Sequence, residues 1–182
     1  MARNIEIKAH VADLDALTAR TAAIADAGPT SIAQDDTFFA CRDGDGDGDS
    51  GGRLKLRDYG DGTGHLIFYR RPDQAGPKES FYVLSPTSSP ATLRDALTLA
   101  NGQSGRVVKR RTLFMVGRTR VHLDRVEGLG DFMELEVVLD EGEASDVGIR
   151  EAQALMARLG IEAAALIDGA YVDLLRARVS TR

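Results

Sequence analysis

The chain has 182 residues, of which 43% are hydrophobic and 28% are charged, a composition typical of a soluble globular protein. A formal net charge of -5 excludes a general electrostatic attraction to nucleic acid or to an anionic membrane. The single cysteine, Cys41, excludes a disulfide scaffold, and we expect a cytoplasmic protein because neither a signal peptide nor a membrane-spanning apolar run is visible.

The first predicted strand covers residues 4–11, where apolar and polar residues alternate strictly. A period of two residues gives a strand one apolar face and one polar face. Asp13 fits the N-cap of a following helix, which the pair Gly28-Pro29 is expected to end. A second strand is predicted at residues 31–40.

Residues 43–52 are dominated by alternating Gly and Asp, which cannot bury an apolar face. The pattern is superficially similar to a calcium-binding loop. An EF-hand loop that begins at Asp43 or Asp45 needs Glu at its twelfth position, where Leu54 or Leu56 stands instead. We therefore interpret this segment as a flexible, solvated loop.

The rest of the chain supplies six more strands and further helices. The strands are predicted at residues 53–59, 65–71, 79–85, 106–116, 118–126 and 132–139. Helices are predicted at residues 90–99, 144–159 and 168–177. Because these elements show no regular βαβ alternation and no second boundary, we predict one domain over residues 1–182 with an antiparallel sheet or barrel.

Several of these strands carry a face that is almost purely charged. The groups that share a face are Arg53, Lys55 and Arg57; Lys109 and Arg111; Arg118, Arg120, His122 and Asp124; Glu134 and Glu136; and Glu6 and Lys8. For any single strand, a solvent-exposed face is the simpler interpretation. In a closed barrel, however, these faces would share one interior. Phosphate would then compensate the cations there, and a hard divalent cation the carboxylates.

The order of the motifs along the chain resembles that of the CYTH family, also called triphosphate tunnel metalloenzymes. The resemblance is carried by Asn4-Ile5-Glu6-Ile7-Lys8, Asp35-Asp36-Thr37-Phe38-Phe39, Arg53-Leu54-Lys55-Leu56-Arg57, Tyr69-Arg70-Arg71-Pro72-Asp73, Lys109-Arg110-Arg111, Arg120-Val121-His122-Leu123-Asp124 and residues 128–136. It covers nearly the whole chain and is similar above all to the branch related to class IV adenylyl cyclases. One departure is Asn4, which stands where the family's opening Glu-x-Glu-x-Lys motif has its first Glu.

The resemblance implies an α+β fold in which an eight-stranded antiparallel β-barrel, the triphosphate tunnel, carries peripheral helices. It implies phosphate ligation by Lys8, Arg53, Lys55, Arg57, Arg71, Lys109, Arg111 and Arg120. It implies that Mg²⁺ or Mn²⁺ is held by Glu6, Glu134 and Glu136, with Asp124 as an added carboxylate. Catalysis is expected to involve Glu6, Lys8, Arg57 and Arg120. Tyr171 is expected to pack in the core or to help close one mouth of the tunnel.

Three functions remain open at this point. Metal-dependent hydrolysis of an inorganic or organic triphosphate is favoured, because 5% aromatic residues and no Trp offer no obvious platform for a nucleobase. The alternatives are a class IV-type adenylyl cyclase, which converts ATP to cyclic AMP and pyrophosphate, and a non-catalytic polyphosphate- or nucleotide-binding module. The expected partner is a triphosphate-containing small molecule. We expect no binding of nucleic acid or of a membrane, and we expect the protein to be a monomer or a homodimer.

Overall fold

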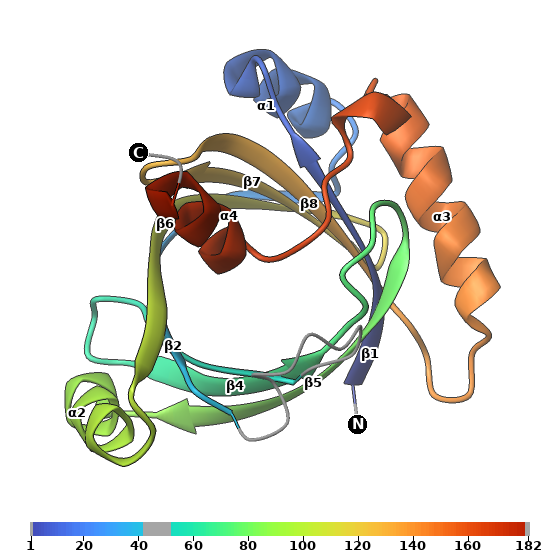
Figure 1. The fold of residues 1–182 in the computed structure, drawn as a ribbon. Coiled ribbons are helices and arrows are strands. Elements are labelled where there is room, and N and C mark those ends of the chain that lie inside the picture. Colours follow the sequence, from blue (N-terminus) through green and yellow to red (C-terminus); the bar gives the residue numbers. More distant parts are fainter. Residues whose placement is uncertain (1, 42–51, 181–182) are drawn as a thin grey trace.

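The structure is a computed structural model that describes residues 2–41 and 52–180, and its strands close into a barrel (Figure 1). The strands are β1 (Ala2–His10), β2 (Ala27–Phe39), β3 (Arg53–Asp58), β4 (Gly64–Arg70), β5 (Lys78–Thr87), β6 (Gln103–Val116), β7 (Thr119–Val126) and β8 (Gly130–Val138). They follow the order β1-β5-β4-β3-β2-β6-β7-β8 around the barrel, and every neighbouring pair is antiparallel. The predicted eight-stranded antiparallel barrel is therefore confirmed. Residues 43–51 of the predicted acidic loop lie outside the described residues.

The helices lie on the periphery of the barrel. They are α1 (Leu14–Ala22), α2 (Pro90–Asn101), α3 (Ser145–Arg158) and α4 (Tyr171–Ser180), with a short 3-10 turn, η1, at Ala163–Ala165. Asp13 caps α1 as predicted, since its carboxylate accepts a hydrogen bond from the backbone N of Ala16 at 2.9 Å. Within the described ranges, no helix has both the length and the apolar character that crossing a membrane requires.

The end predicted for α1 was wrong. The helix stops at Ala22, well before Gly28-Pro29. The reason is that β6 competes for the following backbone: Asp26 N donates to the carbonyl of Met115 at 2.8 Å, and β2 begins at the next residue. Gly28 and Pro29 therefore lie inside a strand and do not form a helix terminus.

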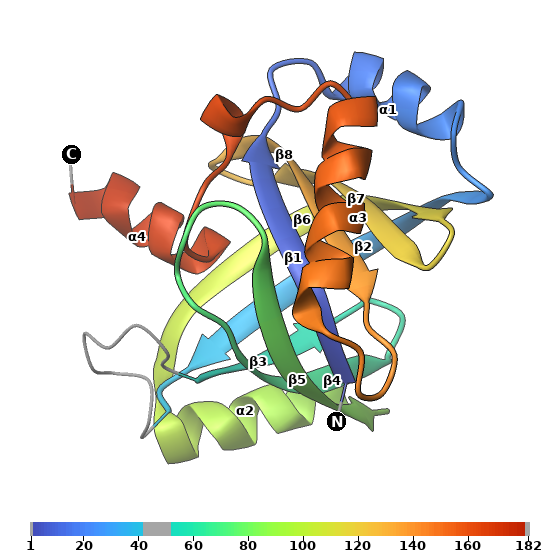
Figure 2. The ribbon, with the colours of Figure 1, turned by 90° about the vertical axis from the view of Figure 1, so that its right-hand side faces the viewer.

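The main hydrophobic core lies on the outside of the barrel wall. Ile5 and Ile7 of β1 and Leu135 of β8 are fully buried in a cluster that also contains apolar residues of α1 and α3. Figure 2 shows α3 lying along β1. The approach is so close that a Cβ on Gly148 of α3 would lie 2.7 Å from Ile5 Cγ1. Burying each such side chain stabilises the fold by about 1.5–3 kcal/mol. Because this apolar packing lies on the outer face of the barrel, the inward-facing side chains can be polar or charged.

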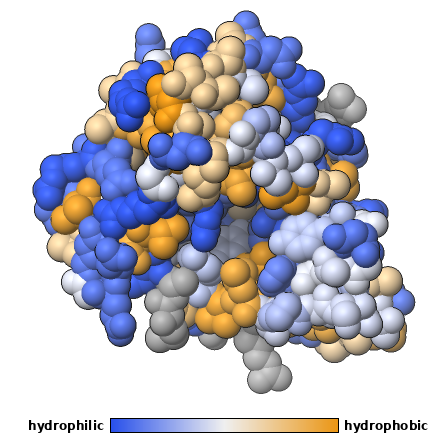
Figure 3. All heavy atoms as spheres, turned by 180° about the vertical axis from the view of Figure 1, so that it is seen from behind, coloured by the Kyte–Doolittle hydropathy of each residue, from blue (hydrophilic) through white to orange (hydrophobic). Residues whose placement is uncertain are grey.

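Helix α4 lies across one end of the barrel. It covers part of the opening in Figure 1 and stands beside the strands in Figure 2. A second apolar cluster, which includes Phe38, Val107 and Val172, joins α4 to the rim. An ion pair from Arg53 of β3 to Asp173 of α4, with an N–O distance of 3.0 Å, adds to this contact. The opposite face of the molecule is hollowed near its centre (Figure 3).

Candidate active site

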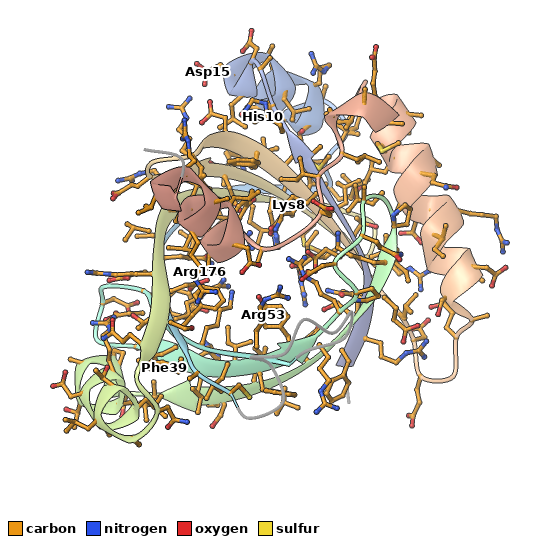
Figure 4. The ribbon with its side chains drawn as sticks, viewed as in Figure 1. Lys8, His10, Asp15, Phe39, Arg53 and Arg176 are labelled. Carbon is orange, nitrogen blue, oxygen red and sulfur yellow. The ribbon has the colours of Figure 1, made fainter. Side chains whose placement is uncertain are left out.

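A cavity of about 310 Å³ lies inside the barrel, and charged side chains form much of its wall. The cations that line it are Lys8, Lys55, Arg57, Arg71, Lys109, Arg111 and Arg120, and the carboxylates that line it are Glu6, Asp36, Glu134 and Glu136. Most of the charged side chains that the strand pattern grouped together thus line one interior. Figure 4 shows Lys8 and Arg53 extending from different sides of the barrel opening, with Asp15 outside on α1.

Asp36 of β2 holds two of the predicted phosphate ligands in place. Its carboxylate accepts hydrogen bonds from Lys55 Nζ at 2.7 Å and from Arg57 Nε and Nη2 at 2.7 and 2.8 Å. Burial alone would raise the pKa of Asp36, but Arg57 and Lys55 together lower it below its ordinary value. The carboxylate is therefore ionised and fixes both cations. We call Lys55, Asp36 and Arg57 the first clamp.

Asp124 of β7 repeats this arrangement on the neighbouring part of the wall. It accepts hydrogen bonds from Lys109 Nζ at 2.8 Å and from Arg111 Nε and Nη2 at 2.7 and 2.6 Å. Arg111 and Arg57 stand directly opposite their Asp partners in the strand registers. Burial would raise the pKa of Asp124, whereas Arg111 and Lys109 lower it. We call Lys109, Asp124 and Arg111 the second clamp, whose Asp124 is 0% exposed.

The carboxylates predicted to bind metal are themselves engaged by cations of the chain. The pairs are Glu6 with Arg71, Glu134 with Arg111 and Lys8, and Glu136 with Arg120. Burial opposes ionisation of Glu134, but Lys109, Lys8 and Arg111 hold its pKa well below the ordinary value. With Asp124 included, seven cations meet five carboxylates in the described wall, so the fully ionised interior keeps a net positive charge.

A compact group of His122, Glu134 and Glu136 provides donor atoms for a divalent cation. One potential ligand atom from each lies within 4.8 Å of the others. Within the described part of the chain, the buried atoms His122 Nδ1 and Asn4 Oδ1 have no hydrogen-bond partner. Carboxylate and amide oxygens suit hard cations, and imidazole nitrogen suits transition metals. The residues present therefore fit a bound divalent ion.

The cavity also has an aromatic and aliphatic side, which the composition did not suggest. All four tyrosines of the chain line it: Tyr59, Tyr69, Tyr82 and Tyr171. The ring of Tyr171 lies 4.1 Å from Lys8 Nζ and 4.8 Å from Lys109 Nζ, and its hydroxyl donates to Asp124 at 3.1 Å. Tyr171 also packs on Phe132 with ring centroids 5.0 Å apart, so it joins the second apolar cluster to the cavity.

Two predicted basic residues occupy other positions than the strand pattern indicated. Arg53 lies outside the cavity lining and pairs with Asp73 and Asp173 beneath α4. Arg118 precedes β7 and is bound outside the cavity by Glu143 and Glu151, so it does not share an inward face with Arg120. The turn between β6 and β7 breaks the alternation before Thr119 and turns Arg118 toward α3.

Three buried groups were not singled out from the sequence: Asp36 and His122, which line the cavity, and Lys78, which lies outside its lining. Alternation could have indicated Asp36, because it lies on the same face of the predicted second strand as Phe38, and both side chains line the cavity. His122 was placed on a charged face but received no role. Lys78 is 1% exposed and donates to the carbonyl of Gln74 at 2.8 Å, and burial with the charges of neighbouring cations lowers its pKa to about 8. Lys78 is the first residue of β5. The residues before it show no alternating pattern, so the local sequence did not indicate that its side chain is buried.

The lowered pKa of Lys55 should make the binding of a polyanion such as inorganic triphosphate depend on pH. Burial and the Arg57 charge lower its pKa to about 7, although Asp36 raises it in part. Above that pH the free amine dominates, and a bound polyanion favours the ammonium form. We expect binding at about pH 8 to take up a proton and affinity to fall as pH rises further. Calorimetry in two buffers of different protonation enthalpy measures the uptake.

The variant Lys55→Arg provides the control for that measurement, because guanidinium keeps its charge throughout this range. Its proton uptake should be smaller than that of the unchanged protein. Some uptake should remain, because the pKa values of Lys78 and Lys109 are also lowered, in each case chiefly by burial. Equal uptake by the two proteins would show that Lys55 is not the titrating group.

Comparison with known proteins gives a consistent set of similarities. A sequence model described as the CYTH domain matches residues 2–171. Adenylate cyclase CyaB of Aeromonas hydrophila is 28% identical over 174 residues, which cover 93% of this chain and 87% of that protein. The structure of PH1012 protein from Pyrococcus horikoshii OT3 has a TM-score of 0.80 at 19% identity and covers 94% of this chain and 99% of that one. A putative adenylyl cyclase from Hippeastrum, described as having a dominant triphosphatase activity, has a TM-score of 0.67 at 16% identity over 96% of both chains. The two structural similarities show a shared fold.

Proposed function

The chain belongs to the CYTH domain family, and from this premise we propose that it is a divalent-metal-dependent hydrolase of a triphosphate held inside the barrel. The observation that carries the proposal is the cavity wall, in which seven Lys and Arg side chains share one space with His122, Glu134 and Glu136. Clustered guanidinium and ammonium groups suit phosphate oxygens, and the carboxylates suit a divalent cation. The description of the Hippeastrum protein supports the same class of reaction.

The two clamps are proposed to grip the phosphate groups. Each presents one ammonium and one guanidinium at a spacing fixed by a buried Asp, so little reorganisation is needed when the anion binds. We assign Asp36 and Asp124 to positioning these cations. For Asp124 this role replaces the metal ligation implied by the resemblance, because its carboxylate is fully buried beneath Lys109 and Arg111.

Hydrolysis in this site is proposed to depend on electrostatic stabilisation and positioning. A bound Mg²⁺ or Mn²⁺ would neutralise phosphate charge and favour in-line attack by water. Glu6, Glu134 and Glu136 would hold it after the phosphate takes over their cation partners. Lys8, Arg57 and Arg120 would stabilise negative charge on the transferring group and on the leaving diphosphate. Asn4 is an amide and therefore takes no part in proton transfer.

A second candidate, cyclisation of a nucleoside triphosphate, is favoured by a separate observation. The four tyrosines, with Ile67 and Leu84, give the cavity an organic-binding side that inorganic triphosphate would not use. In this reaction the ribose 3′-hydroxyl attacks the α-phosphate and pyrophosphate leaves. The name of the Aeromonas hydrophila relative agrees with this alternative.

A product assay separates these functions. Purified protein is incubated with inorganic triphosphate, thiamine triphosphate or ATP, each with Mg²⁺ or Mn²⁺, and orthophosphate, pyrophosphate and cyclic AMP are measured. We expect orthophosphate release from at least one triphosphate and no accumulation of cyclic AMP. Cyclic AMP as the main product would replace the hydrolase by the cyclase. Tight binding without any turnover would leave a binding module.

A further inference from the structure

We propose that His122 is a nitrogen ligand of the divalent cation and that it makes the site favour a first-row transition ion such as Mn²⁺ over Mg²⁺. The inference rests on the proposed metal-dependent function and adds to it a residue and a metal preference. His122 lies on β7, opposite Glu134 of β8 in the strand register. The pairing of β7 with β8 places its side chain near Glu134 and Glu136, and all three side chains line the cavity.

The distances around the imidazole fit a shared cation better than a direct ion pair. His122 Nδ1 lies 3.6 Å from Glu136 Oε1 and 3.9 Å from Glu134 Oε2. Both distances exceed that of a hydrogen bond. Donor atoms that each bind one ion at about 2.1 Å lie about 3–4 Å from one another. His122 Nδ1 is therefore spaced from each carboxylate as one ligand of a shared ion is from another, and the ligand atoms of all three side chains lie within 4.8 Å of one another.

The unsatisfied hydrogen-bonding capacity of His122 points to the same conclusion. The residue is 5% exposed, and within the described residues its Nδ1 has no hydrogen-bond partner. A buried polar atom without a partner is costly, so such atoms in proteins usually serve a ligand, a water or an ion. Nδ1 faces two carboxylates that are already occupied by Arg111 and Arg120. A cation held between these groups would satisfy the imidazole nitrogen.

The donor set determines which cation is favoured. Mg²⁺ binds oxygen ligands and depends on their charge, whereas first-row transition ions accept imidazole nitrogen readily. Asn4 supplies a neutral amide whose Oδ1 is also buried and without a hydrogen-bond partner in the described chain. Fewer carboxylates and one nitrogen donor weaken the site for Mg²⁺ more than for Mn²⁺.

Electron spin echo envelope modulation of Mn²⁺ bound to the full chain tests the proposal, because it detects a directly coordinated imidazole nitrogen without any turnover. We expect nitrogen modulation in the unchanged protein, with and without inorganic triphosphate, and none in His122→Gln. The chain has three histidines, so the double variant His10→Gln/His65→Gln leaves His122 as its only imidazole and should keep the signal. Calorimetry should show the Mn²⁺-to-Mg²⁺ affinity ratio falling at least about tenfold in His122→Gln.

The outcomes separate this inference from the proposed function. Tight Mn²⁺ binding without nitrogen modulation, or modulation that persists in His122→Gln, would overturn the role of His122 and leave a carboxylate metal site standing. Absence of any Mn²⁺ binding would overturn both. If His122→Gln does not fold, the double variant still decides: loss of modulation in a folded His10→Gln/His65→Gln protein that binds Mn²⁺ would rule out His122.

Discussion

Replacing Glu136 with Gln is expected to lower metal-dependent turnover of a triphosphate by at least about a hundredfold. The same change should raise the affinity for triphosphate when metal is absent. The two effects have opposite signs because the Glu136 carboxylate is proposed to hold the cation, whereas in the structure it pairs with Arg120 at 3.3 Å. Removing its charge frees the Arg120 guanidinium, which we propose binds phosphate, and reduces repulsion of the anion.

Steady-state turnover with Mn²⁺ and calorimetric binding of inorganic triphosphate in EDTA measure the two effects. Glu141→Gln is the matched control, because it removes the same charge from an exposed side chain outside the cavity. It should leave both quantities close to those of the unchanged protein. Turnover of Glu136→Gln within about threefold of the control would contradict the assignment of Glu136 as a metal ligand.

Inorganic triphosphate without metal should stabilise the folded protein markedly. Seven cations meet five carboxylates in the described wall, so a polyanion relieves repulsion that the folded state otherwise retains. Ligand at a hundred times its Kd adds about 2.7 kcal/mol to the free energy of unfolding. For a chain of this size, this corresponds to a rise in Tm of about 5–10 °C.

Scanning calorimetry in EDTA measures this rise. Orthophosphate at the same concentration is the control ligand, and it should shift Tm much less because it bridges fewer cations. In Arg57→Gln most of the triphosphate shift should be lost, whereas Arg125→Gln, which changes an exposed cation paired with Asp15, should keep it. Equal shifts in the two variants would show that stabilisation does not come from the cavity.

Residue alternation was sufficient to predict β1 and its two faces, because a period of two requires only local sequence. It could not decide which face points into the barrel. Both faces of β1 are buried, with Ile5 at 0% and Lys8 at 2% exposed, so burial does not distinguish them either. Only the ordered family motifs indicated that the charged face is the inner one.

The parts of the site that strand alternation did not indicate are those set by distant segments, and Arg71 was expected there only from the family resemblance. Arg71 follows the end of β4, yet it is buried because Glu6 and the carbonyl of Gly169 accept its hydrogen bonds. Asp36 can bind Lys55 and Arg57 only because β3 pairs with β2. Alternation carries no information about such pairings, so the clamps and the group around His122 become visible only in the closed barrel.

The placement of the apolar core outside the barrel has a consequence for how this protein can change. Ile5 and Ile7 anchor the helices, while Glu6 and Lys8, between and beside them in the chain, face the cavity. The residues that pack against the helices and the residues that line the cavity thus lie on opposite faces of the same strand. A mutation at an inward position can alter substrate or metal preference without disturbing the helix packing. Asn4, which stands where the family resemblance implies an acid, occupies such an inward position in the cavity wall.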